Sequence, residues 1–292
     1  MNEYEVMIEK LMQNITAQIW QSEDVETRNG IMYCRKCGEP RQEWIDWLPD
    51  RYGKPRRKLV PVPCRCAREA EERQKAEDRK REFENNLRQM RDRAGVDIRG
   101  YANTFEDDDT PDSKISKTCR SYVEEWEPMR KNGTGILLFG AKGTGKSFYA
   151  ACIVNALAER QVATAMMSVP DLIGLMQIRD RAGIAAALKM FPLLVLDDLG
   201  AERDTPYAAE LVYSVVDARY RAKLPTIITT NLDTEDMANE RDLLRSRIYD
   251  RVLQMCPIAI RMQGESKRAE IAERLREKAR AVILRSIGGK NG

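Results

Sequence analysis

Residues 136–147 read Ile-Leu-Leu-Phe-Gly-Ala-Lys-Gly-Thr-Gly-Lys-Ser, an apolar run that ends in a glycine-rich turn. The last eight residues fit the phosphate-binding loop pattern G-x-x-x-x-G-K-[ST]. The run before the turn is typical of a buried strand, and the Ala-rich residues 148–157 after it are good helix formers. This order of strand, loop and helix predicts a nucleoside triphosphate site. The alternative is a glycine turn that binds nothing.

Each residue type in this loop has a physical role. Glycines let backbone N–H groups close around an anionic phosphate, and a helix that begins near Gly145 points its positive end at the same group. Lys146 supplies a charge for the β- and γ-phosphates, and the Ser147 hydroxyl can bind Mg²⁺. The predicted nucleotide-binding residues are Gly140, Lys142, Gly143, Thr144, Gly145, Lys146 and Ser147.

The composition predicts a soluble globular protein with one large and one small domain. The chain has 292 residues, of which 42% are hydrophobic and 33% charged, and its net charge of +3 is too small to indicate nucleic-acid binding by itself. No apolar stretch reaches the length of a membrane span, and residues 1–10 lack the pattern of a signal peptide. We therefore expect a cytoplasmic protein.

The chain has seven cysteines and no histidine. An odd number of cysteines in a cytosolic protein argues against a disulfide framework. Without histidine, a protein-borne metal site has to use Cys, Asp or Glu, and Ser-His-Asp and Cys-His catalysis are excluded.

Two cysteine pairs lie in the N-terminal third, and together they offer four thiolates for a closed tetrahedral Zn²⁺ site: Cys34, Cys37, Cys64 and Cys66. The alternatives are buried free cysteines or a redox pair. A module of this size needs a metal to stabilise its small core. The other three cysteines are expected to be core thiols.

From about residue 100, apolar runs alternate with amphipathic stretches. The runs are 135–139, 163–169, 193–196, 226–230 and 258–262. This alternation predicts a parallel sheet that is covered on both faces.

Polar side chains follow two of these runs. Asp197 and Asp198 end the third run, where Asp197 is placed to hold Mg²⁺ through water and Asp198 or Glu202 to polarise the attacking water. Asn231 ends the fourth run and can orient that water or contact the γ-phosphate. Solvent-facing acids and a strand cap are the alternatives.

A basic helix is predicted over residues 243–252, with Arg245, Arg247 and Arg251 as guanidinium donors. An arginine presented to the nucleotide of a neighbouring subunit would stabilise transition-state charge. A solvated basic face is the alternative.

Several other segments have two interpretations. The basic loop 51–58 can contact nucleic acid or an acidic partner, or be solvated. A helical face of Ile8, Leu11, Ile15 and Ile19 can dock on a partner or pack on the zinc module. A final amphipathic helix over 269–285 can be a reduced lid or an oligomer contact. We divide the chain into the zinc module (1–66), a charged helical linker (67–99) and the ATPase domain (100–292).

Residues from about 95 to 270 resemble the AAA+ ATPase domain of DnaC/DnaI-type replicative helicase loaders, which is close to that of IstB-type transposition helpers. The matching segments are 140–157, 193–202, 217–226, 229–231 and 247–251. The resemblance implies an α/β AAA+ P-loop domain with a parallel sheet that binds and hydrolyses ATP.

The resemblance also implies roles for single residues. Asn231 falls on sensor 1, Arg268 on the sensor 2 arginine, and Arg251 on the arginine finger that acts in trans, with Arg247 as the alternative. Loaders of this kind contact single-stranded DNA at the positions of Thr205 and Tyr207, where any base can stack on a tyrosine. Tyr101 and Phe105 fall near the adenine.

The sequence departs from the family pattern at two places. Most AAA+ proteins have Asp-Glu where this chain has Asp197-Asp198, so we expect slow, DNA-stimulated hydrolysis that suits a switch. The zinc module of DnaI-type loaders uses a histidine, and this chain has none.

The resulting hypothesis is an ATP-dependent loader that binds a hexameric replicative helicase through its N-terminal module. It binds ATP and single-stranded DNA through the ATPase domain, which also self-associates. The alternatives are a transposition helper of IstB type, or a zinc-based DNA-binding protein whose ATPase fold only senses nucleotide.

Overall fold

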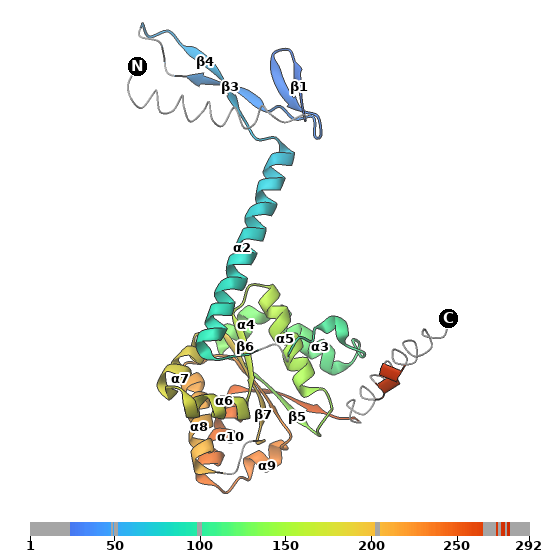
Figure 1. Cartoon of the computed structure of the whole chain (residues 1–292), viewed down its shortest axis with the longest axis vertical. Helices are drawn as coiled ribbons and strands as arrows, with labels where there is room; N and C mark the ends of the chain where they lie inside the picture. Colours follow the sequence, from blue (N-terminus) through green and yellow to red (C-terminus); the bar gives the residue numbers. More distant parts are fainter. Residues whose placement is uncertain are drawn as a thin grey trace, which may run out of the picture. The chain divides into compact units, whose positions relative to one another are not determined.

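The computed structural model describes residues 24–47, 49, 52–97, 101–201, 205–264, 273, 276, 277, 279 and 280. The chain divides into two units, Met1–Glu82 and Phe83–Gly292, which are described separately (Figure 1). Four sets of predicted features lie outside the described residues: the helical face between Ile8 and Ile19, Glu202, Arg268 and most of the final helix over 269–285.

The N-terminal unit contains two antiparallel strand pairs. Strands β1 (Val25–Arg28) and β2 (Ile31–Cys34) form one pair, joined by Asn29-Gly30 with φ of 50° and 78°. An Asn-Gly turn of this kind matches the right-handed twist of a hairpin. Strands β3 (Gln42–Trp47) and β4 (Arg56–Pro61) form the other pair.

The basic segment predicted as a loop over 51–58 is partly a strand. Residues 56–58 begin β4, and Lys58 lies 4.7 Å from the centre of the Trp47 ring on β3. Pairing with an aromatic strand therefore outweighs the low strand propensity of three consecutive basic residues.

Helix α2 (Arg65–Ala94) follows β4 and covers most of the predicted linker. Its polar residues up to Glu82 belong to the N-terminal unit, whereas Leu87 and Ala94 are buried in the core of the second unit. Arg91 also donates to the backbone carbonyl of Thr164 at 2.9 Å. The last turns of α2 are therefore part of the fold of the second unit.

The second unit is built on a five-stranded sheet with the order β6-β7-β8-β5-β9, in which every neighbouring pair is parallel. The strands are β5 (Ile136–Gly140), β6 (Thr164–Ser168), β7 (Leu193–Leu199), β8 (Thr226–Thr230) and β9 (Ile258–Met262). The predicted parallel sheet is confirmed at all five runs.

Helices cover both faces of this sheet, as Figure 1 shows. One core layer involves α6 (Val169–Ile178), α7 (Arg181–Lys189), α8 (Pro206–Arg221) and α10 (Leu243–Met255). The opposite layer involves α3 (Lys114–Glu124), α4 (Trp126–Asn132) and α5 (Lys146–Glu159). Successive residues of β5 alternate between the two layers, as the period of a strand requires. The short elements η1 (Phe105–Asp107) and α9 (Thr234–Ala238) complete the unit.

The strand order brings the predicted catalytic groups together. Strand β8 lies between β5, which leads into the glycine loop, and β7, which ends in the two aspartates. The carboxyl ends of parallel strands share one edge of the sheet, where ligands bind in open α/β folds. Among the helices that the structure describes, none is long and apolar enough to cross a membrane.

Candidate functional site

The glycine loop has the backbone conformation that its composition predicts. Gly140, Gly143 and Gly145 have φ of 126°, 87° and 95°, backbone angles that residues other than glycine rarely adopt. A Cβ on Gly140 would lie 2.4 Å from the carbonyl oxygen of Met262, so this position also requires the close approach of two strands. Helix α5 begins directly after Gly145, with its N-terminus at the loop.

Lys146 is buried and joins the loop to strand β8. Its ammonium donates to the carbonyl oxygens of Gly140 and Ala141 at 2.9 and 2.8 Å, and to Oδ1 of Asn231 at 2.8 Å. The predicted phosphate lysine and the predicted sensor amide are therefore in direct contact.

A second network joins α5, β7 and β8. Ser147 Oγ donates to Asp197 Oδ1 at 2.8 Å, and Thr229 Oγ1 donates to the same oxygen at 2.5 Å. Burial raises the pKa of Asp197, although these hydrogen bonds and the charge of Lys146 oppose that shift. A hydroxyl and a carboxylate held this close form the hard oxygen pair that suits Mg²⁺, so the residues fit the predicted metal.

Thr229 was not predicted as a site residue. It is fully buried within an apolar strand, so its position resembles that of a core residue. Besides Asp197, its hydroxyl contacts the backbone N–H of Asp198 at 2.9 Å and thus supports both aspartates.

Asp198 has a left-handed backbone with φ of 58°. The register between β7 and β8 is irregular from Leu196 to Leu199, around this residue. Aspartate tolerates the left-handed region better than glutamate because its short side chain can bond locally. The left-handed backbone of Asp198 therefore provides a local reason for aspartate, the shorter acid, at this position.

We expect Asp197→Asn to stabilise the nucleotide-free protein while hydrolysis falls about a hundredfold or more, because the predicted Mg²⁺ ligand is lost. A folded-state pKa above the unfolded one means that the charged form opposes folding. This penalty is absent below the unfolded-state pKa and grows as pH rises through the folded one. Thermal unfolding as a function of pH measures the gain, which should vanish in acid. A lower midpoint at pH 7 would contradict it.

The predicted arginines of α10 occupy different environments. Arg251 is mostly buried and forms an ion pair with Asp217 on α8 at 2.8 Å, whereas Arg247 is exposed. The predicted role of Arg251 in trans stays a prediction.

The predicted DNA contacts lie at the N-terminus of α8. Thr205 caps the helix by accepting from the backbone N–H of Ala208 at 3.2 Å. The half-buried ring of Tyr207 lies 4.6 Å from the guanidinium of Arg181, which also donates to the Tyr207 hydroxyl at 2.6 Å. DNA binding by these residues stays a prediction, and Arg181 is a cation beside them that sequence reasoning missed.

Three of the four predicted metal ligands converge in the N-terminal unit. The sulfurs of Cys34, Cys37 and Cys64 all lie within 4.8 Å of one another. Hydrogen bonds from the backbone N–H groups of Cys66 and Glu39 lower the pKa of Cys37 to about 6, which favours its thiolate. A hydrogen bond to Cys37, with burial and nearby sulfur charge, raises the pKa of Cys66 to about 11. The cluster of three thiols is compatible with a Zn²⁺ ion, and Cys66 stays the predicted fourth ligand.

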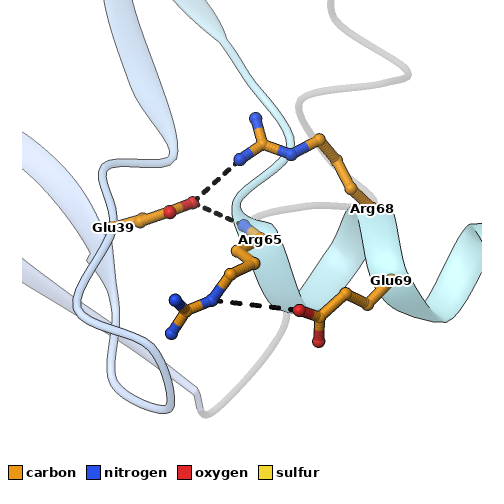
Figure 2. A network of polar contacts seen from close by, with 4 residues as sticks. All are labelled: Glu39, Arg65, Arg68 and Glu69. Atoms are coloured by element: carbon orange, nitrogen blue, oxygen red, sulfur yellow. Dashed lines mark hydrogen bonds and ion pairs between the residues drawn. The ribbon is translucent and has the colours of Figure 1, made fainter.

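Glu39 contacts Arg65 and Arg68 at the start of α2, as Figure 2 shows. Its carboxylate accepts from the backbone N–H of Arg65 at 2.6 Å and from the guanidinium of Arg68 at 3.2 Å. Arg65 lies between Cys64 and Cys66 and begins α2. A carboxylate from the first cysteine loop therefore holds the backbone of the second pair.

This sheet order, glycine loop and acidic strand end define a P-loop nucleotide-binding protein. The chain belongs to the family of IstB-like ATP binding proteins, whose model matches residues 69–276.

The chain is also similar to named helicase loaders. It is 28% identical over 168 residues to the replicative helicase loader DnaI of Bacillus subtilis, covering 53% of this chain and 52% of that protein. It is 31% identical over 140 residues to the replicative helicase loader DnaC of Escherichia coli, covering 46% and 55%. It is 30% identical over 139 residues to a putative ATP-binding protein of insertion sequence IS232 from Bacillus thuringiensis, covering 46% and 55%. The chain thus spans about half the length of these relatives.

A crystal structure of DnaI matches 56% of this chain and 92% of its own, with 27% identity and a TM-score of 0.48. The resemblance that the motifs predicted, to helicase loaders and IstB-type proteins, is confirmed by the family and the relatives.

Proposed function

We propose that this protein is an ATP-dependent loader of a hexameric replicative helicase. Its ATPase domain binds Mg²⁺-ATP and single-stranded DNA, and its cysteine module binds Zn²⁺ and contacts the helicase. The contact of Lys146 with Asn231, beside the network of Ser147, Asp197 and Thr229, carries the nucleotide part of this proposal. The relatives named as replicative helicase loaders support the helicase part, and the cluster of Cys34, Cys37 and Cys64 supports the zinc part.

In this proposal Ser147 and Asp197 would hold Mg²⁺, which would neutralise phosphate charge. Lys146 exchanges its loop carbonyls for phosphate oxygens. Asn231 orients the attacking water, and Asp198 accepts its proton. Hydrolysis then decides whether the cysteine module retains or releases its partner.

Co-purification tests the loader function. The full-length protein is mixed with the replicative helicase of its own host, with and without ATP, and analysed by size exclusion with light scattering. We expect a stable complex that is lost when Cys34 and Cys37 are both replaced by serine. The second candidate is a transposition helper, favoured by the insertion-sequence relative. ATP-dependent filaments on duplex DNA without a helicase complex would support that candidate and overturn the loader.

We expect Asp198→Glu to raise the hydrolysis rate about tenfold, because the longer acid reaches the attacking water more closely. It should also cost about 1 kcal/mol of stability, since glutamate fits the left-handed backbone less well. Steady-state phosphate release and thermal unfolding measure both effects. Asp236→Glu, the same change on the exposed face of α9, is the control. A slower enzyme would remove Asp198 from the role of base.

We expect Glu39→Ala to weaken zinc binding about tenfold, because the backbone between Cys64 and Cys66 loses its carboxylate acceptor. Competition with a chromophoric chelator measures zinc affinity, and the Co²⁺ absorption spectrum reports thiolate coordination. Glu69→Ala is the matched control, because Glu69 contacts only the Arg65 side chain in Figure 2, at 3.9 Å. Equal losses in both variants would show that Glu39 does not position the ligands.

A further inference from the structure

The guanidinium of Arg251 is held inside its own subunit. Its Nη2 lies 2.8 Å from Asp217 Oδ1, and its Cζ lies 4.5 and 5.7 Å from the ring centres of Tyr213 and Tyr220. All three partners are on α8, whereas Arg251 is on α10. The side chain of Arg251 is only 19% exposed. An arginine that acts on the nucleotide of a neighbouring subunit has to project from the surface. In the observed conformation the Arg251 guanidinium instead packs against α8 of its own subunit and is withdrawn from the surface.

Arg219, an arginine of α8, makes a permanent structural contact and serves as a comparison for Arg251. Arg219 is fully buried and donates through all three of its nitrogens, with partners that include Thr226 Oγ1 and the carbonyl oxygens of Leu188 and Pro225. In contrast, the buried Nε of Arg251 has no hydrogen-bond partner among the residues that the structure describes. A buried donor without an acceptor costs free energy, so the buried conformation of Arg251 is less stable than that of Arg219.

Asp217 also has a second partner. Arg221, one turn further along α8, lies 2.9 Å from Asp217 Oδ2 through its Nε. If Arg251 leaves, Asp217 keeps this ion pair and is not left as an isolated charge. The departure of Arg251 therefore avoids the penalty of stranding a partly buried carboxylate.

We propose that Asp217 is a positioning residue that holds Arg251 in its own subunit until the triphosphate on a neighbouring subunit competes for the guanidinium. This inference rests on the proposed ATPase function and on Arg251 as the arginine that acts in trans. Assembly then exchanges one anionic partner for another, a carboxylate for a triphosphate. Isolated subunits accordingly keep the arginine away from solvent and from non-productive anions.

The test is the hydrolysis rate of the full-length protein as a function of protein concentration, at saturating ATP and single-stranded DNA. For Asp217→Asn we expect the half-maximal rate at a protein concentration about fivefold lower than in the wild type, equivalent to about 1 kcal/mol of released ion pairing. The KM for ATP at full assembly should stay unchanged, because Asp217 does not contact the nucleotide. Asp217→Glu, which keeps the charge, should restore the wild-type concentration dependence.

Arg221→Gln is the matched control. It removes the other ion pair of Asp217 and leaves the contact with Arg251 intact, so its half-maximal concentration should not fall. Thermal unfolding of every variant separates a shift in assembly from a loss of folded protein. An unchanged Asp217→Asn curve, or a rate that falls at all concentrations, would overturn the proposal.

Two further variants separate this inference from the function on which it rests. Lys146→Ala without effect on hydrolysis would overturn the proposed ATPase itself. Arg251→Ala with full hydrolysis would instead overturn only the role of Arg251 and thereby the hold by Asp217, and Arg247→Ala would then be the variant that loses activity. If Arg251→Ala is inactive and Asp217→Asn shifts the curve as expected, both inferences are supported.

Discussion

Lys146→Ala is expected to weaken ATP binding by about a hundredfold or more. The Lys146 ammonium is buried at the glycine loop, and a bound triphosphate would accept hydrogen bonds from it. A hydrogen bond to a charged group contributes about 1.5–3 kcal/mol, so two phosphate contacts amount to about 3 kcal/mol or more, or a factor of about a hundred in Kd. Titration calorimetry with Mg²⁺ and a non-hydrolysable ATP analogue measures the change in Kd.

Lys131→Ala is the control for the Lys146 experiment. Lys131 is exposed on α4, away from the loop in sequence, and its removal changes the net charge by the same amount. Thermal unfolding without nucleotide verifies that both variants fold. ATP affinity retained by a folded Lys146→Ala protein would show that the glycine loop is not the nucleotide site.

Arg219→Leu should lower the free energy of unfolding by about 3–5 kcal/mol. The guanidinium satisfies carbonyl oxygens at the C-terminus of α7 and at the entries to β7 and β8, with donor–acceptor distances from 2.6 to 3.4 Å. Burial lowers its pKa to about 9, so the group remains a cation at neutral pH. Leucine fills part of the volume but leaves these carbonyl oxygens without a donor. A buried acceptor without a hydrogen bond destabilises the folded state because it has lost its contact with water.

Urea unfolding of the nucleotide-free protein measures the effect. The matched control is Arg221→Leu, two residues further along α8, whose side chain is 72% exposed and forms a single ion pair with Asp217. This control should change stability by less than about 1 kcal/mol. Equal losses in the two variants would mean that the buried network of Arg219 contributes little.

The fold and the nucleotide loop could be predicted because their signals are local. The glycine positions, Lys146 and Ser147 lie within eight consecutive residues, and the five apolar runs mark five strands. Lys146 and Asn231 are 85 residues apart in the chain. Their placement at one site could be predicted because the carboxyl ends of parallel strands lie at the same edge of a sheet.

Other site residues carried no such signal. Thr229 and Arg219 sit within an apolar strand and a polar helix, where threonine and arginine are ordinary. Glu39 is one acid among 46 acidic residues, and only its hydrogen bond to the backbone of Arg65 distinguishes it. Their roles depend on contacts with segments far away in the chain, and spacing alone does not encode those contacts.

The order of residues along the chain was thus sufficient for the phosphate loop, the acidic strand end, three converging cysteines and the family. Each depends on chemistry within a few residues or on strand ends that a parallel sheet must bring together. Three features needed the folded molecule: the left-handed backbone of Asp198, the buried network of Arg219, and the ion pair that withdraws Arg251. These features arise where two or more elements pack, because packing determines which buried donors find acceptors and which charges are kept from solvent.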